Sequence, residues 1–386
     1  MGAEDQVYRD LQKHLDRSPS GFPAAKSGAD IRLLKHLLTP EEARIALHLS
    51  TLKAEPLKRI HGRVWKSGLL LSLEELRQKL EDMERKGTIL GFEKAYKTKY
   101  YKNVGVSAGG MIDFQVNRLT PDLVADVDRY HEDSFAAAPK PGPVKVSQLR
   151  TIPVEKALPL PEKRLVRTYD DVRQLVAKSP GPFSVANCIC RQMKDLRNQS
   201  CRYSDLRETC LQIGPGHARR YVDMGIGRYI SREEAFRILD QAQEAGFILQ
   251  PENSQRPDNI CCCCGDCCGP LQAAVHSPRP ADLYASNYFV LVDASLCTSC
   301  GTCVKRCQLG ARKMVDGKGT VDLERCIGCG NCVVTCPSKA SQLHAKESLL
   351  VPPRDKDATM MKIMAAKTSK WDMLKLRLKT ALGMRV

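Results

Sequence analysis

The pattern of hydrophobic and polar positions predicts a helical start that ends in a β-hairpin. Capping boxes at residues 39–42 and 72–75 each begin a helix, and the second helix runs to Gly87, a residue suited to a helix end. Its apolar positions recur at helical spacing and predict one buried face: Leu73, Leu76, Leu80 and Met83. The stretches TILGF and KTKYYKNV then alternate like two strands. Together with a helix that opens at Pro56, this pattern predicts a winged-helix domain over roughly residues 30–105.

The pattern changes further along the chain. A turn and a helix that starts at residues 120–122 come first, and residues 136–165 are rich in proline and small residues, which is typical of an extended linker. A compact segment is expected from Tyr169 onward. It holds a helix, the strand FSVAN, and a second helix that begins at a capping box in residues 231–234 and ends at Gly246 before the strand FILQ.

All eighteen cysteines lie in the second half of the chain. Four lie in residues 188–210, six in 261–268 and eight in 297–336. A chain that used cysteine as a small core residue would scatter it, so this grouping indicates thiols that bind metal. Because the chain is long and its start has no apolar signal-peptide core, we expect a protein of a reducing, oxygen-poor cytoplasm and no disulfide framework.

The eight cysteines of residues 297–336 form two copies of the spacing C-x2-C-x2-C-x3-C. Three thiolates at this spacing can wrap one cubane, and the fourth begins a helix that points to the other cubane. One [4Fe–4S] cluster is therefore assigned to Cys297, Cys300, Cys303 and Cys336, and a second to Cys326, Cys329, Cys332 and Cys307. A zinc site would use two well-separated cysteine pairs instead.

Residues 286–346 resemble a bacterial dicluster ferredoxin, through the runs CTSCGTCVKRC and CIGCGNCVVTC and through Pro337. One departure is Gln308, which stands where that family usually has proline after the first run. Because such a proline only shapes the turn, binding of both clusters is still expected. The resemblance implies a ferredoxin-like fold for this segment.

The cysteines upstream of this segment leave three interpretations open. Neighbouring cysteines in residues 261–268 point in different directions, so one cluster cannot easily use all six. The site can be one further Fe–S cluster shared between the two groups, two further clusters, or a zinc or catalytic thiol site. The candidate ligands are Cys188, Cys190, Cys201, Cys210, Cys261, Cys263, Cys264, Cys267 and Cys268.

The order of these segments resembles larger, multidomain ferredoxin-like proteins of anaerobic prokaryotes, which look like redox carriers or adaptor subunits. The expected fold class is α+β, with several domains. The expected segments are a winged-helix-like domain with flanking helices (1–135), a proline-rich linker (136–165), an α/β cysteine-rich domain (166–285), a ferredoxin-like dicluster domain (286–346) and a basic amphipathic tail (347–386).

The formal net charge of +16 raises the question of DNA binding. The third predicted helix, residues 72–86, has five acids and four bases, whereas a helix that enters the major groove normally carries a positive surplus. The basic residues lie on the second helix and the wing: Lys58, Arg59, Arg63, Lys94, Lys97, Lys99 and Lys102. DNA is therefore a disfavoured partner, and the expected role is docking to a protein.

The last 26 residues, 361–386, predict a basic amphipathic helix with an apolar stripe of Trp371, Leu374, Leu378 and Leu382. Such a helix can pack on protein or lie on a membrane surface. No apolar run approaches the roughly 18 residues that span a bilayer. No P-loop, dinucleotide fingerprint, flavin site or small-molecule substrate site is evident.

These features predict an iron–sulfur electron-transfer protein, or a subunit of an oxidoreductase complex, with two [4Fe–4S] clusters and one or two more. No catalytic residue is assigned. Two alternatives remain: a redox-sensing winged-helix transcriptional regulator, and an oxidoreductase with a catalytic cluster in residues 188–268.

Overall fold

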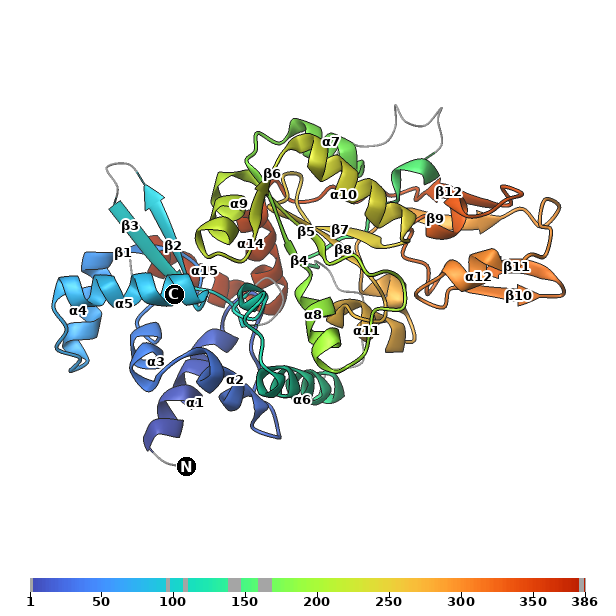
Figure 1. Cartoon of the computed structure of the whole chain (residues 1–386). Helices are drawn as coiled ribbons and strands as arrows, with labels where there is room; N and C mark the ends of the chain where they lie inside the picture. The colour runs from blue at the N-terminus through green and yellow to red at the C-terminus, as the bar shows by residue number, and fades with distance from the viewer. Residues whose placement is uncertain are drawn as a thin grey trace. The chain divides into compact units, whose positions relative to one another are not determined.

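The computed structural model describes residues 3–94, 98–106, 110–137, 147–158, 169–381 and 385 (Figure 1). The chain forms two compact units. One comprises residues 1–138 and 364–386, and the other comprises residues 139–363.

The first unit is helical with one small sheet. Its elements are α1 (Ala3–Asp16), α2 (Ala29–Leu37), α3 (Pro40–Ala46), β1 (Glu55–Pro56), α4 (Leu57–Lys66), α5 (Leu73–Lys86), β2 (Ile89–Lys94), β3 (Thr98–Asn103) and α6 (Pro121–Ala137). Both predicted capping boxes form, at Thr39 with Glu42 and at Ser72 with Glu75. Gly87 ends α5 with a φ of 78°. Strand β3 pairs with β1 on one side and with β2 on the other, all antiparallel.

The predicted buried face of α5 is correct except at its first residue. Leu76, Leu80 and Met83 are fully buried, whereas Leu73 is exposed. Leu73 is the first residue of the helix. Its side chain therefore lies beyond the part of α5 that packs on the domain core.

The second unit is built on a five-stranded antiparallel sheet in the order β6-β4-β5-β8-β7. Its elements are α7 (Val172–Lys178), β4 (Phe183–Asn187), α8 (Ile189–Leu196), β5 (Glu208–Ile213), α9 (Gly214–Asp223), β6 (Arg228–Ile230), α10 (Arg232–Glu244), β7 (Ile248–Pro251), β8 (Asn259–Cys263) and α11 (Gly269–His276). Apolar side chains of α7 and α10 cover one face, and those of α11 cover the other. Figure 1 shows α7 and α10 above the sheet and α8 and α11 below it.

Residues 147–158 of the predicted linker are largely buried rather than laid over the surface. Leu149 and Ile152 form isolated bridges to the β7 region. The buried Arg150 pairs with the buried Asp170 at 2.7 Å. Backbone bridges to the sheet and a buried ion pair therefore hold this extended segment, which its proline-rich composition does not reveal. Residues 136 and 137 of the predicted linker end α6 instead, and residues 138–146 and 159–165 lie outside the described residues.

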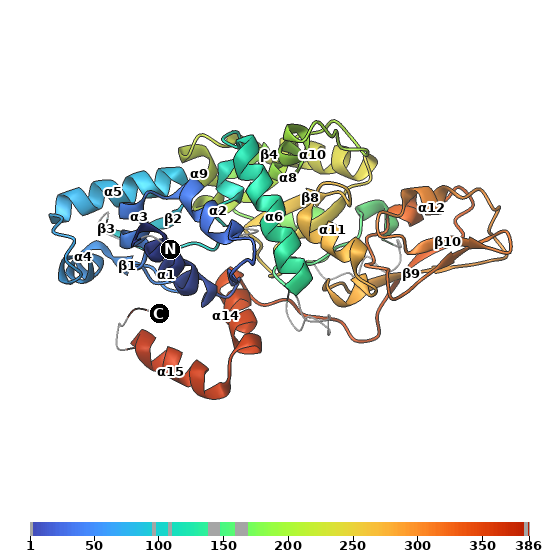
Figure 2. The same cartoon turned by 90° about the horizontal axis from the view of Figure 1, so that it is seen from below.

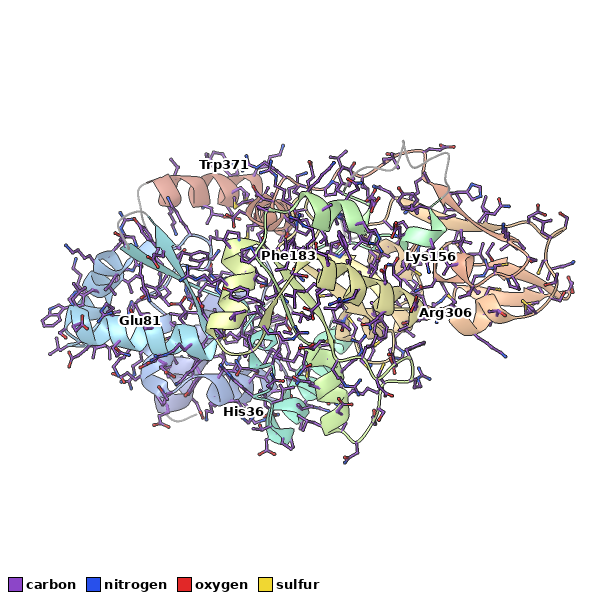
Figure 3. All side chains as sticks on the ribbon, turned by 45° about the horizontal axis from the view of Figure 1, so that its top comes forward. His36, Glu81, Lys156, Phe183, Arg306 and Trp371 are labelled. Carbon is purple, nitrogen blue, oxygen red and sulfur yellow. The ribbon has the colours of Figure 1, made fainter. Side chains whose placement is uncertain are left out.

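Residues 286–346 form two strand pairs around two short helices. The elements are β9 (Tyr288–Val292), α12 (Thr302–Arg306), β10 (Arg312–Val315), β11 (Lys318–Val321), α13 (Asn331–Val334) and β12 (Ser341–Ala345). β9 pairs with β12 and β10 with β11, and Figure 2 shows α12, β9 and β10 together. The Arg306 guanidinium, labelled in Figure 3, donates to the backbone carbonyl of Glu244 at 2.8 Å and so caps α10.

The predicted tail helix is two helices, α14 (Lys356–Lys367) and α15 (Lys370–Ala381). They separate because the Ser369 hydroxyl accepts the Asp372 amide at 3.1 Å and starts a new helix. Trp371, labelled in Figure 3, is 72% exposed, and Leu374 and Leu378 are also exposed. Leu382 lies outside the described residues. In the part of the chain that the structure describes, no helix combines the length and apolarity needed to cross a bilayer.

Candidate metal centres

Four cysteines from the two ends of the dicluster segment line one cavity. Cys297, Cys300 and Cys303 come from the loop before α12 and from α12 itself, and Cys336 follows α13. Cys300 is exposed, so this centre opens to the surface. Backbone amides, among them that of Gly319 at 3.3 Å from the sulfur, lower the pKa of Cys297.

The other four cysteines of the segment lie deeper. Burial raises the pKa of Cys329 to about 12, with Cys307 and Cys326 as negative neighbours that add to the shift. Burial also raises the pKa of Cys332, and its nearby thiols are again Cys329, Cys307 and Cys326. The segment before α7 covers this group, since the Val154 amide donates to the Cys329 carbonyl at 3.0 Å. The structure thus brings Cys307 to the second cysteine run and Cys336 to the first.

Comparison with known proteins agrees with this geometry. Residues 289–337 match the family model described as 4Fe-4S dicluster domain. The match supports a ferredoxin-like dicluster domain in this part of the chain. No curated protein and no solved structure matches the chain.

A buried arginine in this dicluster domain fits an anionic cluster. Arg312 is 3% exposed and lines the cavity of the first four cysteines. Its Nη2 donates to Ser341 Oγ at 3.0 Å. Its Nε and Nη1 find no hydrogen-bond partner in the described part of the chain. Unpaired buried donors are costly, and the sulfides and thiolates of a cubane would supply acceptors and negative charge.

The cysteine-rich run upstream is divided by strand geometry. Side chains of a strand alternate between the two faces of its sheet, so Cys261 and Cys263 of β8 lie on one face and Cys262 on the other. Cys263 belongs to the apolar cluster of α11, and Cys262 and Cys264 belong to that of α7 and α10. The run therefore supplies two separate thiol groups.

Six thiols are linked around Cys261, Cys263 and Cys268, which pack on the α11 side. Cys261 hydrogen-bonds with Cys210 and Cys263, and these bonds lower its pKa. Hydrogen bonds with Cys190 and Cys263 lower the pKa of Cys268 to about 6. Cys188 in turn hydrogen-bonds with Cys190. We call Cys188, Cys190, Cys210, Cys261, Cys263 and Cys268 the six-thiol group.

Three further thiols and a carboxylate gather on the other side. The sulfurs of Cys201, Cys264 and Cys267 and an oxygen of Asp266 all lie within 4.8 Å of one another. The sequence places Cys188, Cys190, Cys201 and Cys210 in one set of four, but the structure brings Cys201 to a different group from the other three. Cys262, which the sequence analysis leaves out of the ligands, is buried in the apolar core and is not a member of this four-atom group.

Arg191 connects the two sides. It is fully buried at the start of α8, and its Nη2 donates to the Cys262 carbonyl at 2.9 Å and to Cys264 Sγ at 3.5 Å. Its guanidinium lies 3.8 Å from the centre of the Phe247 ring. Although burial opposes it, nearby Cys188 and Cys264 raise the Arg191 pKa. A fixed positive charge therefore stands beside both thiol groups.

Sequence reasoning missed three of these residues as parts of the sites: Asp266, Arg191 and Arg312. Asp266 stands inside C-G-D-C, a spacing that could have indicated a ligand. Arg191 directly follows the Cys188-x-Cys190 pair, and the sequence does not reveal that its side chain is buried. Nothing in the sequence around Arg312 distinguishes it from a surface arginine.

Proposed function

We propose that this protein carries electrons along a line of iron–sulfur clusters to a partner oxidoreductase. One observation carries the proposal. Cys263 and Cys268 of the six-thiol group pack in the same apolar cluster as Cys307 and Cys329 of the dicluster domain. Each [4Fe–4S] cluster supplies a site that accepts and releases one electron when it is bound. Ligands that share one dry core are placed for short electron-transfer steps.

The residues of the chain divide the line into an outer and an inner end. Cys297, Cys300, Cys303 and Cys336 would hold the outer cluster, and the exposed Cys300 gives a partner protein access to it. Cys326, Cys329, Cys332 and Cys307 would hold the second cluster under a cover of apolar side chains, including Val154 and Ala157. The buried Arg312 would balance the negative charge between the two.

The six-thiol group would hold a further cluster. A cubane needs four thiolates, and this group offers six from three parts of the chain. Side-chain amides supply donors to its sulfurs: Gln212 Nε2 lies 2.9 Å from Cys210 Sγ, and Asn259 Nδ2 lies 3.4 Å from Cys261 Sγ. Such donors stabilise thiolates and tune the cluster they bind.

The first unit fits a winged-helix-like docking domain. The order α3, β1, α4, α5, β2, β3 and the antiparallel sheet β1-β3-β2 are those of a winged helix. The basic side chains of α5 are engaged in ion pairs, for example Lys79 with Glu41 at 2.6 Å. We infer that this unit binds a protein partner, and that the exposed Trp371 stripe of α15 is a second contact, to protein or to a membrane surface.

Two matched substitutions in the full-length protein test the ligand assignment. Cys307→Ser should damage the buried cluster of Cys326, Cys329 and Cys332, and Cys336→Ser should damage the outer one. Anaerobic iron and sulfide analysis of the wild type should give at least about eight irons per chain from the dicluster domain, and about twelve with a cluster in the six-thiol group. Electron paramagnetic resonance of each variant then identifies the missing signal.

The proposal fails in two ways. Fewer than about six irons in anaerobically reconstituted protein would remove the dicluster assignment. Loss of the outer cluster in Cys307→Ser would show that each run binds its own fourth cysteine. A Cys263→Ser variant that keeps every iron of the wild type would contradict the assignment of a further cluster to the six-thiol group.

A further inference from the structure

We propose that Cys201, Cys264, Cys267 and Asp266 bind one zinc ion in a closed tetrahedral site, separate from the iron–sulfur clusters. The four residues come from two loops. Cys201 lies between α8 and β5, and the other three lie in the turn from β8 to α11. The inference rests on this geometry and not on the proposed electron transfer.

The distances between the ligand atoms are those of a mononuclear site. Cys201 Sγ lies 3.6 Å from Cys264 Sγ. Asp266 Oδ1 lies 3.7 Å from Cys201 Sγ and 3.5 Å from Cys267 Sγ. A tetrahedral zinc with Zn–S of about 2.3 Å and Zn–O of about 2.1 Å separates two sulfurs by about 3.8 Å and a sulfur from an oxygen by about 3.6 Å. All three measured distances agree with this geometry.

The dicluster domain provides an internal comparison. A cubane binds each thiolate to a different iron, so its four cysteine sulfurs stand further apart than around a single ion. Among the residues that the structure describes, Cys201, Cys264, Asp266 and Cys267 are the one group of three or more ligands within 4.8 Å of one another. The eight described cysteines of the dicluster domain form no such group. The compact group is therefore built for one ion and not for a cluster.

Burial and charge also call for a cation here. The three cysteines and Asp266 are each at most 6% exposed. Asp266 Oδ2 accepts the Arg202 amide at 2.8 Å, while Oδ1 faces the sulfurs of Cys201 and Cys267. Arg202 Nε lies 3.8 Å from Oδ2. Metal ligation requires the cysteines as thiolates, and buried thiolates that face a carboxylate oxygen are unfavourable unless a cation lies between them. A divalent ion would neutralise half of the four negative charges, and Arg191 at Cys264 would offset part of the remainder.

The loop geometry is organised around these ligands. Lys194 Nζ and Gln272 Nε2 both donate to the Asp266 carbonyl, at 2.7 and 2.6 Å. These bonds orient the turn, as outer contacts do in metal sites. The cysteines of the turn have the C-x2-C spacing of structural zinc sites. Four protein ligands leave no open position, so we assign a structural role: the ion ties residues 197–207, which lack helix and strand, to the end of β8.

The ligand chemistry selects the ion. Three thiolates are soft donors that exclude magnesium and calcium, and a tetrahedral arrangement is the one zinc prefers. The expected content is one zinc per chain in full-length protein purified without added metal. Zinc-edge X-ray absorption should show about three sulfurs near 2.3 Å and one lighter atom near 2.1 Å. This wild-type measurement does not depend on any variant that fails to fold.

Matched variants of the full-length protein then locate the ion. Cys201→Ser and Asp266→Asn should lower the zinc content severalfold and leave the iron content unchanged. Cys262→Ser is the control, because Cys262 is a buried cysteine of the same run outside the group. Cobalt loaded in place of zinc should give thiolate charge-transfer bands that Cys201→Ser weakens and Cys262→Ser preserves.

The outcomes distinguish this site from the clusters. Zinc below about 0.2 per chain, or zinc with only light-atom neighbours, would overturn the proposal. Loss of about four irons per chain in Cys201→Ser would place a cubane here instead. Neither result bears on the dicluster domain, whose iron and paramagnetic signals are measured independently.

Discussion

The side-chain oxygen of Gln308 accepts the backbone amide of Gly265 at 2.6 Å, which joins the dicluster domain to the cysteine-rich turn. The Gln308 amide nitrogen donates in turn to the Gly246 carbonyl at 2.7 Å, at the end of α10. Gln308 directly follows the ligand Cys307 and stands where a bacterial dicluster ferredoxin usually has proline. The departure from that pattern therefore has a structural purpose, because proline could make neither bond.

Replacing Gln308 by proline should loosen the contact between the two parts. The Gly265 amide would lose its partner, whereas the Gly246 carbonyl would keep the Asn331 side-chain amide at 2.8 Å. Leaving one backbone group unpaired costs roughly 1–3 kcal/mol, so the free energy of unfolding should fall by about that amount. Anaerobic denaturant titration measures this loss, and amide hydrogen exchange at Gly265 should accelerate. Gln308→Glu keeps one acceptor oxygen and should cost less. Equal stability of Gln308→Pro and the wild type would refute the role.

The two copies of the cluster loop differ in how much space they leave for a side chain in place of glycine. Gly301 and Gly330 occupy equivalent positions, with φ of 68° and 75°. A Cβ at Gly301 would meet nothing within 4 Å, whereas a Cβ at Gly330 would lie 2.6 Å from the Ala157 Cβ. Both alanine variants should lose about 1–2 kcal/mol to left-handed backbone strain. Gly330→Ala should lose roughly 1–3 kcal/mol more through overpacking.

Anaerobic denaturant titration of both variants checks this prediction, with loss of the visible cluster absorbance as the readout. Gly301→Ala is the control that measures the cost of left-handed backbone strain alone, since its side chain would point into open space. If the two variants unfold at the same denaturant concentration, residues 153–157 do not pack on the buried loop as the structure shows.

The cluster spacing was readable from the sequence, and the packing around it was not. The spacing predicts which cysteines belong to the dicluster domain, and residues 289–337 match its family model. Ser299 and Gly328 occupy equivalent positions in the two copies of the cluster loop, and both have positive φ. Only the structure explains the different residues: Ser299 is exposed, whereas a side chain at Gly328 would collide with the Tyr288 carbonyl.

The upstream cysteines show a second limit of sequence reasoning. Alternation along a strand correctly indicates that neighbouring cysteines point apart, but the partner of each thiol depends on sheet order. Cys210 lies opposite Cys261 because β5 pairs with β8. Cys201 reaches Cys264 because the loop after α8 folds back over the turn. Neither contact follows from spacing, since the partners are 51 and 63 residues apart in the chain.

Glu252 should make the stability of the second unit depend on pH. It is 3% exposed, and burial raises its pKa from 4.5 to about 7, with Asp258 adding to the shift and Lys356 opposing it. A raised carboxyl pKa means that the folded state binds the proton more tightly than the unfolded state. The stabilisation is complete below about pH 4.5 and is lost as the pH rises through about 7, by roughly 3 kcal/mol in total.

The measurement compares the wild type with Glu252→Gln between about pH 5.5 and pH 8. The wild type should lose stability relative to this variant as the pH rises, because glutamine stays neutral throughout. Glu208→Gln, at an exposed carboxylate paired with Arg228 at 2.7 Å, is the control and should show no such trend. A constant difference between the wild type and Glu252→Gln across this range would contradict the prediction.

The first unit should show no preference for any DNA sequence. In α5, Arg77 pairs with Glu81 at 3.1 Å and Lys86 with Glu42 at 2.5 Å, and Arg85 pairs with Asp82. Side chains held by carboxylates neutralise phosphates poorly, and a specific regulator keeps a preference of roughly 10³-fold or more at physiological salt. Selection from random duplex DNA at about 150 mM salt, with oxidised and with reduced protein, should enrich no site.

A gain-of-charge variant shows whether that selection could have detected binding. Glu74→Gln with Glu81→Gln removes two of the carboxylates around Arg77, which also contacts Glu74. This double variant should bind duplex DNA more tightly but without sequence preference. Its affinity should also fall more steeply with salt, with a slope of the logarithm of affinity against the logarithm of salt concentration that is steeper by roughly one to two. An enriched palindrome whose binding by the wild type depends on the redox state would instead identify a regulator. No enrichment, together with co-purification of an oxidoreductase, is the result that electron transfer to a protein partner requires.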